Sequence, residues 1–113
     1  MANSYHQRMS GKKKEALPHV VRFLKRATDR TRLVTNFNVR EFIGYRGIEL
    51  SEADVRFIIR HIRLHALVPR LVASSGGYWI ENHTGTFKRY CSRLHRRGLK
   101  IVSLSRAMLD QCS

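Results

Sequence analysis

The stretch that most constrains how this chain can fold is LSEADVRFIIRHIRLHALVPRLVASSGGYWI, residues 50–80. It opens with a helix-start signal, because Ser51 is followed three residues later by Asp54, a variant of the capping box that usually carries Glu or Gln. The apolar residues that follow recur at helical spacing and predict one buried face. That face consists of Val55, Ile58 or Ile59, Ile62 and Ala66.

The residues after this helix predict a small antiparallel hairpin. Pro69 prevents the helix from continuing. Two short β-prone runs, residues 71–73 and 78–80, flank the sequence Ser-Ser-Gly-Gly, which contains the glycines that a tight turn requires. Because a two-stranded hairpin is only marginally stable alone, we expect it to pack against the helices. Its expected anchors are Leu71, Trp79 or Ile80.

Two more helices are predicted before residue 51. Residues 15–28 carry apolar side chains at spacings of three and four, and Pro18 falls in the first turn, where proline is tolerated. Residues 29–37 form a linker with a short extended piece at Leu33 and Val34. Asn38 is the predicted N-cap of a short second helix that ends near the glycines at 44 and 47. The buried face of this helix consists of Val39, Phe42 and Ile43.

The charge of the chain indicates a polyanionic partner. Its 113 residues lie near the usual size of one domain, 42% of them are hydrophobic, and 22 Lys and Arg oppose 8 Asp and Glu, for a formal net charge of +14. Nucleic acid is the first candidate partner, and an anionic membrane surface or an acidic protein patch is the alternative. On the helix that starts at Ser51, a stripe of Arg56, Arg60 and Arg63 is expected to contact phosphates or base edges; the alternative is a solvated or structural role.

The N-terminal residues 1–14 resemble a flexible basic arm that ends in Lys12, Lys13 and Lys14. No apolar run reaches the roughly 18–20 residues of a membrane span, and the N-terminus lacks the apolar core of a signal peptide. The chain is therefore expected in the cytoplasm, either with the nucleoid or in the cytoplasm of a host cell. Cys91 and Cys112 form no CxxC pair, so reduced thiols are expected.

Enzymatic chemistry is not expected. Only Glu52 and Asp54 are acidic residues close together in sequence, and their separation points them in different directions on a helix. His61 and His65 are four residues apart, but no third metal ligand has a suitable spacing, so surface or groove-facing histidines are predicted. The sequence contains no P-loop, dinucleotide fingerprint or nucleophile motif. We expect no cofactor, no metal and no small-molecule ligand.

The segment from Val39 to Trp79, LSEADVRFIIRHIR leading through VPRLVASSGGYW, resembles the winged helix-turn-helix domains of bacterial regulators and phage-encoded proteins. In those domains a recognition helix of the form xxVRxxIxxLR runs into xPIxSxxxGYW. The chain departs from this pattern at Ala66 and Leu67, where a glycine is common, and at Leu71, where isoleucine is usual. The resemblance implies a mainly α fold with a small β-hairpin, with the winged domain at residues 15–83.

The resemblance also implies which residues contact double-stranded DNA. Residues 51–65 would be the recognition helix in the major groove, and residues 71–80 would be the wing on the backbone or the minor groove. Nearest the bases on this helix would be Ser51, Glu52, Ala53, Arg56 and either Phe57 or Arg60. The wing contacts would be Ser74, Ser75, Gly76 and Gly77. Phosphate contacts are expected from Tyr45, Arg46 and the three lysines at 12–14.

A long C-terminal helix is predicted at about residues 86–111, within the segment 84–113. Phe87, Leu94, Ile101 and Met108 are spaced by sevens, which favours a helix–helix seam and a homodimer. Tyr90, Leu104 and Cys91 lie beside this row. The alternative is that the helix packs back across its own domain, and Gly98 marks a candidate kink or break. A second phosphate-binding surface is expected at Lys88, Arg89, Arg93, Arg96, Arg97 and Lys100.

The function that these features favour is sequence-specific binding of double-stranded DNA, by a transcriptional regulator or a replication or origin accessory factor of phage or bacterial type. One alternative is a small phage-encoded interaction module that inhibits a host nucleic-acid-processing complex through its basic face. A basic RNA-binding protein of ribosomal type is the other.

Overall fold

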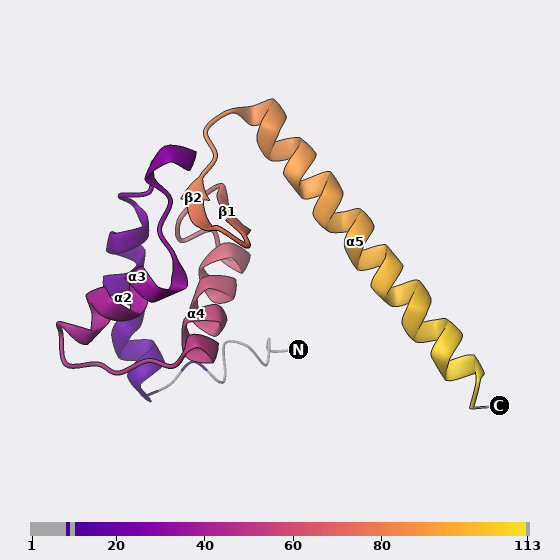
Figure 1. Cartoon of the computed structure of the whole chain (residues 1–113), viewed down its shortest axis with the longest axis horizontal. Coiled ribbons are helices and arrows are strands. Elements are labelled where there is room, and N and C mark those ends of the chain that lie inside the picture. The colour runs from indigo at the N-terminus through magenta and orange to yellow at the C-terminus, as the bar shows by residue number, and fades with distance from the viewer. Residues whose placement is uncertain (1–8, 10, 113) are drawn as a thin grey trace. The chain divides into compact units, whose positions relative to one another are not determined.

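The computed structural model describes Met9 and residues 11–112. The chain forms two compact units that divide between Asn82 and His83. As predicted, the fold is mainly α, with three helices, a two-stranded hairpin and a long C-terminal helix (Figure 1). The first unit contains α2 (Gly11–Leu24), the short 3₁₀ helix η1 (Arg30–Arg32), α3 (Asn36–Gly44), α4 (Glu52–Leu64), β1 (Leu71–Ser74) and β2 (Gly77–Ile80). The second contains α5 (Thr84–Asp110).

Helix α2 begins and ends earlier than the predicted range of 15–28. The lysines at 12–14 belong to its first turn, so their assignment to a flexible arm is wrong; lysine is a good helix former, and these residues extend the helix toward Gly11. The rest of the predicted arm, residues 1–8 and residue 10, lies outside the described residues. At the other end, the carbonyl of Ala27 accepts a hydrogen bond from the Ile80 amide at 2.8 Å, so the chain here pairs with β2 instead of continuing the helix.

The N-cap of α3 is Thr35, not Asn38 as predicted. The Asn38 amide donates to Thr35 Oγ1 at 3.0 Å, and the Thr35 amide donates to Asn38 Oδ1 at 2.9 Å. Asn38 is therefore the second partner of a capping box, three residues inside the helix. Val39 and Ile43 are buried as predicted, and the half-buried ring of Phe42 stacks on Phe23 with centroids 4.4 Å apart.

Helix α4 begins after the predicted N-cap, Ser51, and supplies the centre of the core. The spacing predicts Ala66 in that core, but Ala66 is exposed and has a φ of 51° just beyond the end of the helix. The chain turns there through the left-handed conformation that ends many helices and that favours glycine. The largest fully buried side chains of the core are Ile58 and Ile62 of this helix together with Leu24, Ile43 and Val20.

The hairpin has the predicted strands and a third short segment beside them. β1 and β2 are antiparallel, with Leu71 paired to Ile80 and Ser74 paired to Gly77. Val34 bridges Tyr78 through two backbone hydrogen bonds of 3.0 and 2.7 Å, which confirms an extended piece at this position. β2 therefore lies between β1 and Val34.

Of the expected anchors, Leu71 and Ile80 pack on the core, so the alternative between Trp79 and Ile80 is decided for Ile80. Leu71 is buried and Ile80 packs against the same cluster. Trp79 does not join this cluster; its indole Nε1 donates to Glu81 Oε1 at 3.3 Å, and the Arg30 guanidinium lies 5.8 Å from its ring centroid. Val72, opposite Trp79 in the hairpin register, is buried in addition.

Helix α5 runs from Thr84 to Asp110 without interruption, so the kink or break considered at Gly98 is absent. Its N-cap is His83, whose Nδ1 accepts a hydrogen bond from the Thr86 amide at 3.1 Å. Across the part of the chain that the structure describes, every helix is too short or too polar to span a bilayer.

Candidate nucleic-acid interface

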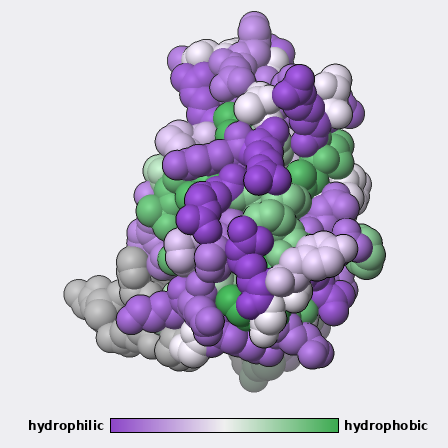
Figure 2. Space-filling model, turned by 90° about the vertical axis from the view of Figure 1, so that its left-hand side faces the viewer, coloured by the Kyte–Doolittle hydropathy of each residue, from purple (hydrophilic) through white to green (hydrophobic). Residues whose placement is uncertain are grey.

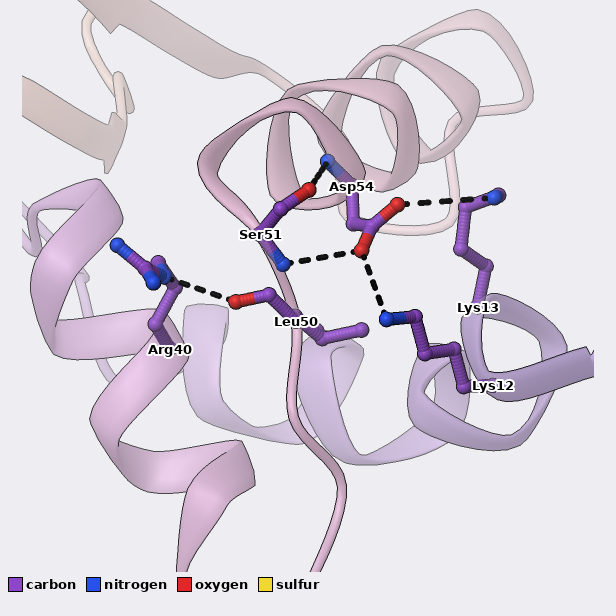
Figure 3. Close-up of polar contacts among 6 residues, drawn as sticks. All are labelled: Lys12, Lys13, Arg40, Leu50, Ser51 and Asp54. Atoms are coloured by element: carbon purple, nitrogen blue, oxygen red, sulfur yellow. Dashed lines mark hydrogen bonds and ion pairs between the residues drawn. The ribbon is translucent and has the colours of Figure 1, made fainter.

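The first turn of α4 is held by a reciprocal cap. The Ser51 amide donates to Asp54 Oδ2 at 2.9 Å, and the Asp54 amide donates to Ser51 Oγ at 3.0 Å (Figure 3). The bond from the Ser51 amide stabilises the carboxylate and lowers the pKa of Asp54 below its ordinary value, and the Ser51 hydroxyl and Lys12 lower it further. Asp54 is therefore a carboxylate at neutral pH and completes the cap.

Side chains from α2 and α3 converge on this turn. Lys12 Nζ lies 3.4 Å from Asp54 Oδ2, and Lys13 Nζ lies 3.7 Å from Asp54 Oδ1. Arg40, on α3, donates from Nε to the carbonyl of Leu50 at 2.9 Å, just before the helix starts. Figure 3 shows these residues around one point, so the beginning of α4 is fixed from two other helices. The two lysines that sequence reasoning assigned to an arm thus lie beside the predicted recognition helix.

The predicted contact residues of α4 differ in exposure. Ser51, Glu52, Ala53, Arg56 and Arg60 are exposed. Phe57 and Arg63 are half-buried, and the Lys13 ammonium lies 5.4 Å from the Phe57 ring centroid. Arg56 Nη1 lies 3.6 Å from Glu52 Oε1, in a pair whose two side chains are both more than 60% exposed. Such an exposed pair contributes little stability, so a stronger acceptor can draw Arg56 away from Glu52.

The hairpin tip is short and is partly closed by its own hydrogen bonds. Only Ser75 and Gly76 connect the paired residues Ser74 and Gly77. Ser74 Oγ accepts from the Gly76 amide at 3.1 Å and donates to the Gly77 carbonyl at 3.3 Å. Gly77, predicted as a contact residue, is buried. The exposed residues that this tip offers to a ligand are Ser74, Ser75 and Gly76.

A groove brings the first turns of α4 and the hairpin tip together. It has a volume of about 390 Å³ and is lined by Glu52 and Arg56, by residues 74–78, and by the first residues of α3. Sequence reasoning missed the α3 contribution, which consists of Thr35, Asn36 and Phe37. Phe37 is 65% exposed and falls outside the buried row of its helix, which is the signal that could have drawn attention to it.

Two predicted phosphate contacts lie away from this groove. Tyr45 is 84% exposed at the C-terminal end of α3. Arg46 follows it, with its guanidinium 4.2 Å from the Phe42 ring centroid and its Nε donating to His19 Nδ1 at 3.2 Å. Neither residue lines the groove.

The histidine pair on α4 also differs from expectation. His61 is 6% exposed rather than on the surface, and its ring centroid lies 4.5 Å from that of His65. Among the described residues there is no group of three His, Cys, Asp or Glu side chains with the geometry to hold a metal ion. This pair does not form part of the groove.

Helix α5 carries the other predicted residues, in a unit of its own. Leu94, Ile101, Leu104 and Met108 are exposed, while Phe87 and Tyr90 are half-buried. The basic residues predicted as a second phosphate surface all lie on this helix and are exposed. The face of the molecule drawn in Figure 2 is mostly hydrophilic, with smaller hydrophobic areas between the polar side chains.

Comparison of the chain with known protein families, with curated proteins and with solved structures finds no match in any of the three.

Proposed function

We propose that the first unit is a winged helix-turn-helix domain that binds double-stranded DNA sequence-specifically. The observation that carries this proposal is the groove that the exposed first turns of α4 share with the hairpin tip, in a chain of net charge +14. In a winged helix, the recognition helix and the wing contact the same stretch of DNA. A shared groove between these two elements is what such a contact requires.

The order of elements supports this assignment. A helix, a short bridging strand at Val34, two helices and a two-stranded hairpin follow one another, and β2 lies between β1 and Val34. In this assignment α3 and α4 form the helix-turn-helix and α4 enters the major groove. The hairpin forms a short wing whose tip, with two connecting residues, contacts the DNA backbone rather than extending into the minor groove.

Different side chains then position the domain and read the sequence. Lys12 and Lys13, beside the start of α4, contact phosphates and fix the orientation of the helix. Arg56 exchanges its exposed contact with Glu52 for the O6 and N7 atoms of a guanine, where a bidentate contact gives roughly 1–3 kcal/mol of discrimination. The domain would serve a transcriptional regulator or a replication accessory factor of phage or bacterial type.

Selection of bound duplexes from a random pool tests this function. The parent is expected to enrich one family of sequences and to bind it more tightly than unrelated duplexes, with an affinity that falls steeply as salt rises. The double substitution Arg56→Ala and Arg60→Ala is expected to lower the preference for the selected duplex by tenfold or more, because a bidentate hydrogen-bonded pair with a base supplies roughly 1–3 kcal/mol of discrimination.

A matched control removes the same charge from positions outside α4. Lys14 and Lys25 are exposed, and neither lines the groove. The double substitution Lys14→Ala and Lys25→Ala is expected to weaken binding to all duplexes alike and to leave the preference unchanged. Absence of any enriched sequence contradicts the proposed function, while an unchanged preference in the Arg56/Arg60 variant contradicts the assignment of α4 as the reading helix.

A further inference from the structure

Helix α5 carries two rows of residues, each with a period of seven. The large row consists of Phe87, Leu94, Ile101 and Met108. The small row consists of Cys91, Gly98 and Ser105 and is continued by Cys112, two residues beyond the end of the helix. Because the two rows are offset by four residues, they lie side by side along one face of the helix. We call this face the seam. From Cys91 to Cys112 every residue of this face is exposed, so this stretch has no covering partner among the described residues.

Gly98 is the residue that the isolated helix explains least. It lies in the middle of α5, where glycine is a poorer helix former than any residue except proline. A Cβ added to Gly98 would meet no atom within 4 Å. Nothing within the chain therefore requires glycine here, whereas a neighbouring helix packed closely against the seam would.

Most of the charges of α5 lie away from the seam. The helix carries seven basic residues and one acidic residue, Asp110. At about 100° per residue, four of the basic residues lie roughly 130–180° around the helix from the centre line of the seam. These are Arg89, Arg93, Arg96 and Lys100. The seam residues themselves carry no charge, which suits burial against another apolar helix face.

We propose that the seam of α5 packs against the seam of a second copy of this chain, in antiparallel orientation. In an antiparallel pair each layer contains one residue from either row, so that large side chains face small ones throughout. Gly98 then faces the partner's Ile101, and Leu94 faces the partner's Ser105. A parallel pair would instead alternate large–large layers with small–small layers. Alternation of large and small residues across an interface is the arrangement that fills space evenly.

The residues that flank the seam fit the same antiparallel register. Lys88 lies beside the partner's Leu109, and Arg97 lies beside the partner's Leu104, so these basic side chains meet apolar neighbours instead of each other. Their aliphatic stems can cover the leucines while the charged groups remain in water. The pairing is two-fold symmetric and uses the same surface on both copies. It does not depend on DNA binding and is tested without DNA.

The molar mass in solution tests the pairing itself. The full chain is expected to show twice its single-chain mass of 13.2 kDa at micromolar concentration. Gly98→Leu is expected to return the mass to that of one chain, even though leucine is the better helix former. Arg96→Leu, two residues away on the opposite side of the helix, is the matched control and is expected to remain dimeric.

The native cysteines test the orientation. In the antiparallel register Cys91 faces the partner's Met108, while the two Cys91 residues lie about 25 Å apart at 1.5 Å per residue. The double variant Met108→Cys, Cys112→Ser is therefore expected to form a disulfide-linked dimer under mild oxidation. The single variant Cys112→Ser is expected to stay unlinked. Efficient linking of this single variant overturns the antiparallel orientation, because it would place the two Cys91 residues opposite each other.

A chain that remains monomeric at all concentrations overturns the proposal. Loss of sequence-specific DNA binding with an intact dimer would leave this inference standing.

Discussion

Glycine is required at position 77 because the backbone of Val34 lies close to it, not because the hairpin tip must be narrow. Its φ is +141°, and a Cβ at this position would lie 2.6 Å from the carbonyl oxygen of Val34. Gly76, next to it, would bring a Cβ only to 3.6 Å from Ser74 Oγ and has no positive φ. The sequence identifies both glycines as turn residues, but only the structure distinguishes the one that admits the Val34 segment beside β2.

Because of this difference, we expect alanine to be tolerated at position 76 but not at position 77. Gly77→Ala is expected to lower the free energy of unfolding by roughly 2–4 kcal/mol, because it strains the backbone and disrupts the two hydrogen bonds between Val34 and Tyr78. Gly76→Ala is expected to change it by less than about 0.5 kcal/mol. Urea unfolding followed by the fluorescence of Trp79, the single tryptophan, measures both. Equal stability of the two variants would contradict the close approach described here.

Ala66 illustrates what spacing alone cannot decide. Its position continues the apolar row of α4, and on that ground the sequence places it in the core. The helix instead ends at Leu64, and Ala66 adopts a left-handed conformation while the Leu67 amide bonds to the Ile62 carbonyl at 3.0 Å. This turn delivers Val68 to the core, where it is 1% exposed. Burial of Val68 offsets the cost of the strained alanine, and that balance is a tertiary effect.

At the level of elements, the sequence predicts the kind of each helix and strand but not every end. The N-cap at Ser51 is predicted correctly because Ser51 and Asp54 together match the capping-box signature. At α3, Thr35 and Asn38 are both good N-caps, and the choice between them depends on their mutual hydrogen bonds. The predicted part of the groove comes from α4 and the hairpin. The contribution of α3 could not be predicted, since it depends on how α3 packs beside them.

Because Asp54 belongs to the cap of α4, we expect the free energy of unfolding to depend on pH in the acid range. Because the folded state lowers the pKa of Asp54 below its ordinary value of 3.8, the carboxylate stabilises the fold above that pH. This stabilisation is lost as the pH falls through the folded-state pKa. Asp54→Asn is expected to lower the free energy of unfolding at pH 7 by roughly 0.3–1 kcal/mol, the usual effect of an acid in the first turn.

Comparison of unfolding at pH 7 and pH 2 checks this expectation. The difference in unfolding free energy between the parent and Asp54→Asn should narrow at the lower pH, because protonation of the parent carboxylate removes its charge. Asp29 also has a lowered pKa, caused first by its hydrogen bond from the Thr31 hydroxyl, so Asp29→Asn serves as the control for acid effects outside the cap. If the difference in unfolding free energy between the parent and Asp54→Asn is the same at both pH values, the effect of the substitution comes from the cap geometry alone.

For the whole molecule, core and charge are distributed differently along the chain. The buried apolar residues of the described part lie between Ala16 and Val72, entirely within the first unit. Seven of the 22 basic residues lie on α5, which contributes no buried side chain. The first unit thus contains the core that stabilises it, whereas α5 carries a large share of the charge that would attract a polyanion.

This separation predicts the effect of ending the chain at Asn82. The shortened protein is expected to unfold at the same urea concentration as the parent, because its core is complete and Trp79 reports on that core from within the first unit. Its DNA affinity should fall for every duplex and depend less steeply on salt, since fewer phosphates are neutralised. Its preference for the selected duplex, measured as an affinity ratio per binding domain, should persist because α4 and the hairpin remain. Loss of that preference in a folded shortened chain would mean that α5 takes part in reading the sequence.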